Sequence, residues 1–256
     1  MRSQIPNLIT LGNLFCGCCA LLWALAGRPD FALWFTLGCF ACDTADGLVA
    51  RALKVSSPIG VQLDSLADMV SFGVVPGALL YRLLAPLPST WGVSFYPPLS
   101  ALPEASGHLE SFMFSWAAIP AFVLTMAAAY RLGKFNVDTR QTSYFLGLST
   151  PACTVFVTGL ALSVFHNRFG AGEWLMANNW VVYPLIALLS WLMVTEIPLA
   201  GMKIKSFGWR GNEALITMLA VFVALLFVVR ELAFCIIIVL YILYSLFNKK
   251  SILSAA

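Results

Sequence analysis

The sequence predicts an all-α protein, a polytopic membrane helical bundle of about eight transmembrane helices with both termini in the cytoplasm. Of its 256 residues, 60% are hydrophobic and only 11% are charged, a composition that soluble domains rarely have. The mean hydropathy is +0.86. The apolar residues form continuous runs, whereas the strands of a membrane barrel would alternate in polarity. Because a helix satisfies its own backbone polar groups inside a bilayer, these runs predict helices.

Eight apolar runs are candidates for membrane spans. A spanning helix needs about 20 mostly apolar residues to cross a hydrocarbon core of roughly 30 Å. The runs cover about residues 8–27, 31–50, 60–82, 111–131, 147–166, 180–200, 213–229 and 231–248. The last two are short and are separated only by Arg230 and Glu231, so we expect a tight helical hairpin. No clear small-residue cleavage site follows the first run, and we therefore expect a membrane helix there instead of a signal peptide.

Lysine and arginine are distributed unevenly between the two sides that eight spans define. Eleven of the 15 lie on the side of the termini and four on the other, so the positive-inside rule places the termini in the cytoplasm. The proline-rich segment 83–110 is then expected to be an external loop, since proline at this density breaks helices. We expect one integral-membrane domain over 1–256, with a core of about 1–200 and a basic cytoplasmic loop plus the hairpin within 201–256.

Other composition features exclude some classes of function. The small net charge of +3 gives no reason to expect nucleic-acid binding. The seven cysteines nearly all lie in apolar runs, and we interpret them as small hydrophobic residues of helices, without a disulfide framework or a zinc site. His108 and His166 fall in segments expected to be external, and we assign them no role.

Four of the twelve carboxylates lie within 26 residues, at the end of the second run and the start of the third. They are Asp43, Asp46, Asp64 and Asp68. Ionised groups near the hydrocarbon of a bilayer are costly and are seldom found there without a function. Residues three or four apart share a helix face. Both pairs therefore converge if the short connection makes the two helices antiparallel neighbours.

Converging carboxylates would repel one another, and a divalent cation removes that conflict. Ligands that are all oxygen favour a hard ion, Mg²⁺ or Mn²⁺. Four carboxylates are enough for two ions, a common arrangement in transfer at phosphorus. The sequence therefore predicts a metal site on the cytoplasmic side of the membrane.

Residues around the carboxylates are suited to a ligand that contains phosphate. Gly47 and Gly60 allow a bulky group to approach the backbone, although they also suit close packing of helices. Arg51 offers a planar fork for phosphate oxygens, although it also fits an anchor at the cytoplasmic membrane surface. Ser57 and Pro58 lie in the expected turn, where the serine could contact a nucleotide base or act only as a turn residue.

The segment from Asp43 to Asp68 resembles the signature of the CDP-alcohol phosphatidyltransferases. That signature is D-x2-D-G-x2-A-R-x8-G-x3-D-x3-D, and the segment has all eight fixed residues at the right spacing. Three further segments, 5–17, 131–137 and 147–152, resemble the phosphatidylserine synthase branch of the family. That branch usually reads R-L-A-R-F-N where this chain has Gly133 and Lys134 in the third and fourth places, and a lysine keeps the charge but loses the bidentate fork.

The resemblance implies an enzyme that transfers the phosphatidyl group of CDP-diacylglycerol to L-serine and releases CMP. It implies that Asp43, Asp46 and Asp64 hold Mg²⁺ or Mn²⁺, as two ions, and that Asp68 is the general base and a further metal ligand. The implied contacts of the CDP moiety are Asn7, Thr10, Gly47, Arg51, Ser57, Pro58 and Gly60. It also implies a homodimer in the inner or plasma membrane of the cell, with the active site facing the cytoplasm.

The acceptor is the most open part of this interpretation. Arg131, Lys134 and Asn136 could bind the serine carboxylate or a lipid phosphate, or Arg131 and Lys134 could only anchor the membrane surface. A synthase of the same family could instead use glycerol 3-phosphate or an inositol phosphate. Two other classes also bind divalent cations through aspartates in membranes, the prenyltransferases and the cation transporters.

Overall fold

The computed structural model describes the chain except for residues 1–3, 56, 86–114, 138–143, 202–212 and 250–256. Up to residue 137 its elements are α1 (Gln4–Leu25), α2 (Pro29–Leu53), α3 (Pro58–Asp68), the π-helix η1 (Met69–Val74), α4 (Val75–Leu84), the 3-10 helix η3 (Trp116–Ala121) and α5 (Phe122–Val137). Then follow β1 (Tyr144–Leu146), α6 (Thr150–Phe165), η4 (Arg168–Gly170), α7 (Ala171–Ala177), η5 (Asn179–Val181), α8 (Val182–Val194), β2 (Pro198–Ala200), α9 (Glu213–Val229) and α10 (Leu232–Phe247).

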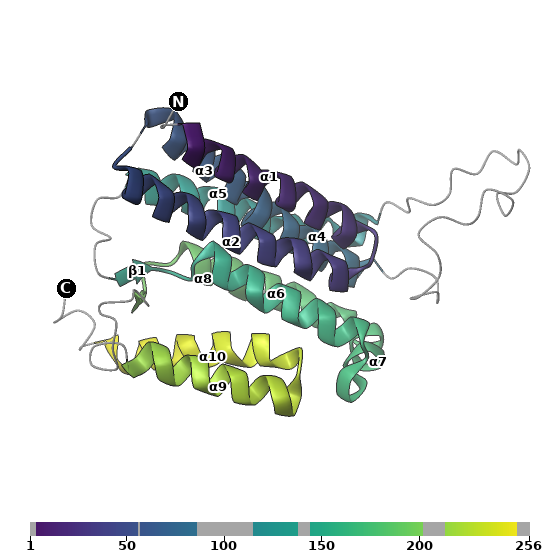
Figure 1. Ribbon diagram of the computed structural model, residues 1–256. Helices are drawn as coiled ribbons and strands as arrows, with labels where there is room; N and C mark the ends of the chain where they lie inside the picture. Colours follow the sequence, from purple (N-terminus) through teal and green to yellow (C-terminus); the bar gives the residue numbers. More distant parts are fainter. Residues whose placement is uncertain (1–3, 56, 86–114, 138–143, 202–212, 250–256) are drawn as a thin grey trace, which may run out of the picture.

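The helices form an elongated bundle in which the long elements lie side by side (Figure 1). The start of α1, the turn between α2 and α3 and the end of α10 lie at one end, which we call the site end. The connection from α6 to α7 and the turn between α9 and α10 lie at the opposite, far end. The α9–α10 hairpin packs along α6, where Gly159 allows the close approach because a Cβ there would lie 2.4 Å from the Cβ of Phe234.

α4 is the central helix of the bundle. Nine of its ten residues are buried, and among them Leu79 and Leu80 belong to the largest fully buried side chains. α1, α5, α6 and α8 surround it. It continues directly from α3 through η1, so α3, η1 and α4 form one helical run, Pro58–Leu84.

Local sequence explains where the elements near the site begin and end. α2 ends at Leu53, and Lys54 directly after it takes a left-handed conformation with φ of 53° that closes the helix. The side chain of Ser57 then caps α3 by accepting a hydrogen bond from the backbone N–H of Gly60, and Pro58 occupies the first helical position, where its missing N–H costs nothing. The short turn brings the end of α2 and the start of α3 to the site end, where α1 packs against both of them and α2 and α3 make few direct contacts. The expected direct packing of α2 on α3 is therefore not observed.

The structure has a helix in each of the eight predicted runs, but fewer certain spans. Within the described residues three helices are long and apolar enough to cross a membrane, and a fourth if the bent pair Arg168–Leu175 and Asn179–Val194 is one span. The predicted run 180–200 ends as a helix at Val194, and the chain then extends into β2 because Pro198 cannot continue a helix. The predicted external loop lies, beyond residue 85, outside the described residues.

A short antiparallel pair of strands departs from the all-α prediction. β1 and β2 pair with Tyr144 opposite Ala200 and Leu146 opposite Pro198. The alternating pattern of a strand is too short here, at three residues each, to be visible in the sequence. The pair joins the link before α6 to the link after α8 at the site end of the bundle.

Candidate metal and nucleotide site

Three of the four predicted metal ligands meet at the site end. Asp43 extends from α2, and Asp64 and Asp68 extend from one face of α3. One carboxylate oxygen from each of the three lies within 4.8 Å of the other two. The fourth, Asp46, lies one turn along α2 and interacts electrostatically with the other three.

The carboxylates have neutral partners only, as far as the structure describes the chain. Thr10 donates a hydrogen bond of 2.6 Å to Oδ2 of Asp46, and Asn13 donates one of 3.1 Å to Oδ1 of Asp68. Oδ1 of Asp64 is buried and has no hydrogen-bond partner among the described residues. No lysine or arginine among the described residues forms a salt bridge with any of the four.

These observations fit a divalent cation. Carboxylates at this separation repel one another unless a positive charge lies between them, and buried polar atoms without a partner are rare in native proteins. Oxygen ligands of this kind suit Mg²⁺ or Mn²⁺. Asp43, Asp64 and Asp68 could therefore hold such an ion, with Asp46 close enough to join them.

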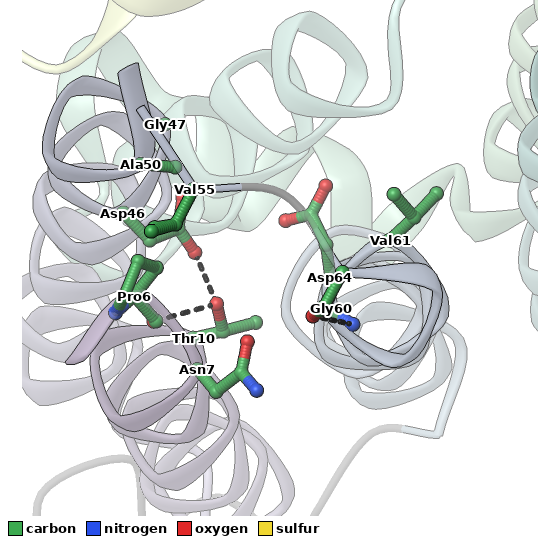
Figure 2. A pocket seen from close by; sticks show the side chains of 11 residues that line it. Pro6, Asn7, Thr10, Asp46, Gly47, Ala50, Val55, Gly60, Val61 and Asp64 are labelled. Carbon is green, nitrogen blue, oxygen red and sulfur yellow. Dashed lines mark hydrogen bonds between the residues drawn. The ribbon is translucent and has the colours of Figure 1, made fainter. Parts of the chain in front are cut away.

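A cavity of about 160 Å³ lies beside the carboxylates, between α1, the end of α2 and the start of α3. Figure 2 shows Asp46 and Asp64 on its walls, with Thr10 directed at Asp46. Of the predicted CDP contacts, those that line the cavity are Asn7, Thr10, Gly47, Ser57 and Gly60. Its other lining residues, not predicted from the sequence, are Pro6, Ala50, Val55 and Val61.

The two predicted glycines have different surroundings. A Cβ added to Gly60 would lie 2.9 Å from Oδ1 of Asn7 and 2.9 Å from Oγ of Ser57. A Cβ added to Gly47 would meet nothing nearer than 4.0 Å, where it would reach Nη2 of Arg51. Gly60 therefore allows packing within the protein, whereas Gly47 leaves open a part of the cavity that the protein itself does not fill.

Two predicted CDP contacts lie at the edge of the site and do not line the cavity. Arg51 is exposed, and its Nε donates a 3.0 Å hydrogen bond to the backbone carbonyl of Gly47. Pro58 begins α3 and has the helix-starting role described above. Arg51 nonetheless lies beside the open space at Gly47, where a phosphate in the cavity could meet its guanidinium.

Asn13 is a site residue that sequence reasoning did not assign. It is fully buried, and its amide bridges Asp68 to Ser71, whose hydroxyl donates a 2.7 Å hydrogen bond to Oδ1 of Asn13. Ser71 lies in η1, the π-helix that directly follows Asp68, and such segments are frequent at functional sites. Gly17 allows α1 to approach there, because a Cβ would lie 2.5 Å from Oγ of Ser71.

A signal for Asn13 exists in the sequence. Asn7, Thr10, Asn13 and Gly17 recur every three or four residues in an otherwise apolar helix, so they share one face. The structure turns the last three of them inward. A polar stripe on a membrane helix is a functional signal in itself.

The three residues predicted for the acceptor lie on α5 near the site, with different partners. Arg131 is buried, and its Nε has no hydrogen-bond partner within the described chain. Lys134 forms a 2.6 Å ion pair with Glu196, which lies in the link between α8 and β2. Asn136 donates a 2.8 Å hydrogen bond to Oγ of Ser65, the residue that follows Asp64.

The family follows from comparison with known proteins. The family model for CDP-alcohol phosphatidyltransferase matches residues 3–186, and the chain belongs to this family. Relatives include proteins named CDP-diacylglycerol–serine O-phosphatidyltransferase from Mycobacterium leprae, 29% identical over 93% of this chain and 72% of that protein, and from Helicobacter pylori, 28% identical over 94% and 89%. The protein of that name from Bacillus subtilis is 30% identical over 58% of this chain and 70% of its own length. The family predicted from the aspartate segment is confirmed.

Proposed function

We propose that the protein transfers the phosphatidyl group of CDP-diacylglycerol to the hydroxyl of L-serine and releases CMP, in a reaction that depends on Mg²⁺ or Mn²⁺. The observation that supports this most directly is the cluster of Asp43, Asp64 and Asp68, which forms no salt bridge with any described lysine or arginine and lies beside a cavity. The names of the relatives favour serine as the acceptor.

The residues have separate roles in this proposal. Asp43, Asp46 and Asp64 would hold the metal, as two ions with Asp68 as a further ligand. When bound, the ions would supply positive charge against the pyrophosphate and the leaving CMP. The contacts of the CDP moiety are Asn7, Thr10, Gly47, Arg51, Ser57, Pro58 and Gly60, with Thr10 acting through its hydrogen bond to Asp46.

Asp68 is the general base of the proposed step. A serine hydroxyl is a weak nucleophile at neutral pH, so a positioned carboxylate must take its proton as the new bond forms. The hydroxyl oxygen attacks the phosphorus of the phosphatidyl group, and the bond from this phosphorus to the oxygen bridging it to CMP breaks. The bridging oxygen leaves with CMP. The hydrogen bond from Asn13 to Oδ1 of Asp68 orients this carboxylate for accepting the proton.

The setting of the site in the membrane is also part of the proposal. One integral domain with eight spans, cytoplasmic termini and a homodimeric assembly would place the site end at the cytoplasmic surface of the inner or plasma membrane. There the acyl chains can stay in lipid while the CDP group enters the cavity. Serine would then enter from the cytoplasm toward Arg131, Lys134 and Asn136.

An acceptor screen tests the proposal. Purified protein is incubated with CDP-diacylglycerol, Mn²⁺ or Mg²⁺ and one alcohol at a time, and CMP release is measured. We expect CMP with L-serine and little with glycerol 3-phosphate or an inositol phosphate. CMP release with one of these phosphates and none with serine would assign the protein to another acceptor within the family.

A further inference from the structure

The ion pair between Lys134 and Glu196 lies beside the acceptor residues but joins distant parts of the chain. Nζ of Lys134, near the end of α5, is 2.6 Å from Oε1 of Glu196, in the link between α8 and β2. Both side chains are partly exposed, at 31% and 57%. Ion pairs with this exposure contribute little stability, because water competes for both charges, so the pair can open at low cost.

A small hollow of about 10 Å³ lies beside this pair, lined by Arg131 and Lys134 from α5 and by Thr195, the residue before Glu196. It is no larger than a water molecule, so a ligand of the size of serine can enter only when the ion pair opens. Arg131 is only 8% exposed, and its Nε has no hydrogen-bond partner among the described residues. A buried guanidinium with an unused donor is costly unless a ligand accepts from it.

The backbone holds Glu196 firmly in this position. Gly147 donates a 2.9 Å hydrogen bond to the carbonyl of Ile197, and its φ of +71° is a conformation that favours glycine. A Cβ at Gly147 would lie 2.6 Å from the carbonyl oxygen of Thr195. The residues on both sides of Glu196 are therefore fixed against the turn before α6.

The hollow is near the reacting carboxylate. Arg131 interacts electrostatically with Asp68, and α5 is joined to α3 by the hydrogen bond from Asn136 to Ser65, between Asp64 and Asp68 in sequence. A small alcohol whose charged groups lie at Arg131 and Lys134 can therefore direct a hydroxyl toward Asp68.

We propose that Glu196 determines the acceptor, by binding the ammonium group of serine while Arg131 and Lys134 bind its carboxylate. This inference rests on the proposed function. Serine has a negative carboxylate and a positive ammonium group, and the Lys134–Glu196 pair offers a positive and a negative side chain. When serine binds, Lys134 exchanges Glu196 for the serine carboxylate, and Glu196 takes the ammonium in place of Lys134. An acceptor phosphate would instead place its negative charges against Glu196 and be repelled.

Steady-state kinetics of Glu196→Gln test the proposal, with CMP release as the readout. Loss of a charge-assisted hydrogen bond predicts that KM for L-serine rises about tenfold, with kcat and the KM for CDP-diacylglycerol close to wild type. 3-Hydroxypropionate has the hydroxyl and carboxylate of serine but no ammonium. Its inhibition constant against serine should not rise in the variant. Glu173→Gln, on α7 at the far end, is the matched control, and its KM values are expected to equal those of wild type.

A charge swap separates recognition from simple packing. The double variant Lys134→Glu/Glu196→Lys restores an ion pair between the same positions. If the pair only stabilises the fold, serine KM returns to the wild-type value and the proposal is wrong. If Glu196 binds the ammonium, the KM stays high because each charge now faces the wrong end of serine.

Failure of the role of Glu196 can be distinguished from failure of the proposed function. A wild-type serine KM in Glu196→Gln, in an enzyme that releases CMP with serine, overturns the role of Glu196 and leaves the proposed function intact. A wild-type enzyme that releases CMP with glycerol 3-phosphate and not with serine overturns the proposed function, and the role of Glu196 with it.

Discussion

The carboxylates at the two ends of the bundle have opposite electrostatic surroundings. At the far end, Glu231 lies in the turn between α9 and α10 and is balanced by Arg168, whose Nε lies at 3.1 Å, while Nδ1 of His166 also lies at 3.1 Å. At the site end, Asp43, Asp64 and Asp68 lie within 4.8 Å of one another, and none forms a salt bridge with a described residue. Figure 1 shows the length of the bundle between them.

The difference separates a structural contact from a binding site. At the far end, the ion pair between Glu231 and Arg168 joins the C-terminal hairpin to the segment after α6, and both charges belong to the chain itself. The site end leaves like charges together, a repulsion that a folded chain tolerates where a ligand supplies the missing charge. We therefore expect substitutions at the far end to change stability, and substitutions at the site end to change binding and catalysis.

The largest effect is expected for Asp68→Asn. Loss of a general base lowers the rate by a factor of about 10² to 10⁴, while binding of CDP-diacylglycerol persists because Asp43, Asp46 and Asp64 remain. When a chelator removes the metal, the unfolding temperature of the variant should equal or exceed that of wild type, because the variant has one fewer negative charge in the cluster. Transfer rate, CDP-diacylglycerol binding and thermal unfolding are measured. Near-normal turnover would exclude Asp68 as the base.

The next effect concerns metal binding and stability. At a concentration about 100 times its Kd, an ion that binds only the folded state stabilises it by about 2.7 kcal/mol. We expect Mn²⁺ or Mg²⁺ to raise the unfolding temperature of wild type by several degrees. Asp43→Asn should weaken both this shift and nucleotide binding, whereas Glu231→Gln should keep the full shift. An equal shift in Asp43→Asn and wild type would place the ion elsewhere.

The carboxylate cluster at the site end was largely predictable from helix periodicity. Spacings of three and four residues, with a short turn, predict that Asp43 meets Asp64 and Asp68, and the structure brings them together. The approximate positions of the helices were also predictable, from the apolar runs. Boundaries were less certain, because Pro198 and the positive φ of Gly147 produce the β1–β2 pair in links that apolar composition alone extends as helix.

Contacts between distant residues could not be predicted in the same way. Lys134 and Glu196 are 62 residues apart, and their meeting depends on the turn at Gly147. Asn13 reaches Ser71 because η1 changes the helical register directly after Asp68, and nothing in local propensity indicates a π-helix there. The position of Arg51 outside the cavity also depends on a side-chain contact, its hydrogen bond to Gly47.

A smaller effect is expected for Asn13→Ala, which removes a neutral partner of the site. Groups that orient a metal ligand or base typically change activity by about 10- to 100-fold when lost. We expect kcat to fall within this range while the KM for CDP-diacylglycerol changes little. Asn13→Asp is the informative companion, because it keeps the shape but adds a further negative charge. It should be less active than Asn13→Ala, and the reverse order would mean that Asn13 acts only through packing.

Gly47→Ala and Gly60→Ala separate ligand space from protein packing. An alanine at Gly47 meets no protein atom nearer than 4.0 Å and should stabilise α2 by about 0.5–1 kcal/mol, yet raise the KM for CDP-diacylglycerol about tenfold, a cost of about 1.4 kcal/mol. An alanine at Gly60 contacts Asn7 and Ser57 at 2.9 Å and should lower stability itself. Unchanged KM in Gly47→Ala would show that the CDP group does not use this part of the cavity.

The smallest effect is expected at the far end, for Glu231→Gln. Burial alone would raise the pKa of Glu231, but its backbone hydrogen bond and the neighbouring Arg168 and His166 together lower that pKa below its usual value of 4.5. The carboxylate therefore stabilises the fold fully above about pH 4.5, and this contribution is lost as the pH falls through the lowered pKa. With partners about one-third exposed, we expect a loss of about 1 kcal/mol at pH 7.

The pH dependence and the activity together test this assignment. The difference in unfolding free energy between wild type and Glu231→Gln should shrink toward zero as the pH falls below the pKa of Glu231. The transfer rate at pH 7 and the shift in unfolding temperature with Mn²⁺ should both equal those of wild type. A transfer rate that falls tenfold or more in this variant would mean that the hairpin turn at the far end is coupled to the carboxylates at the site end, and the two ends could then no longer be treated as independent.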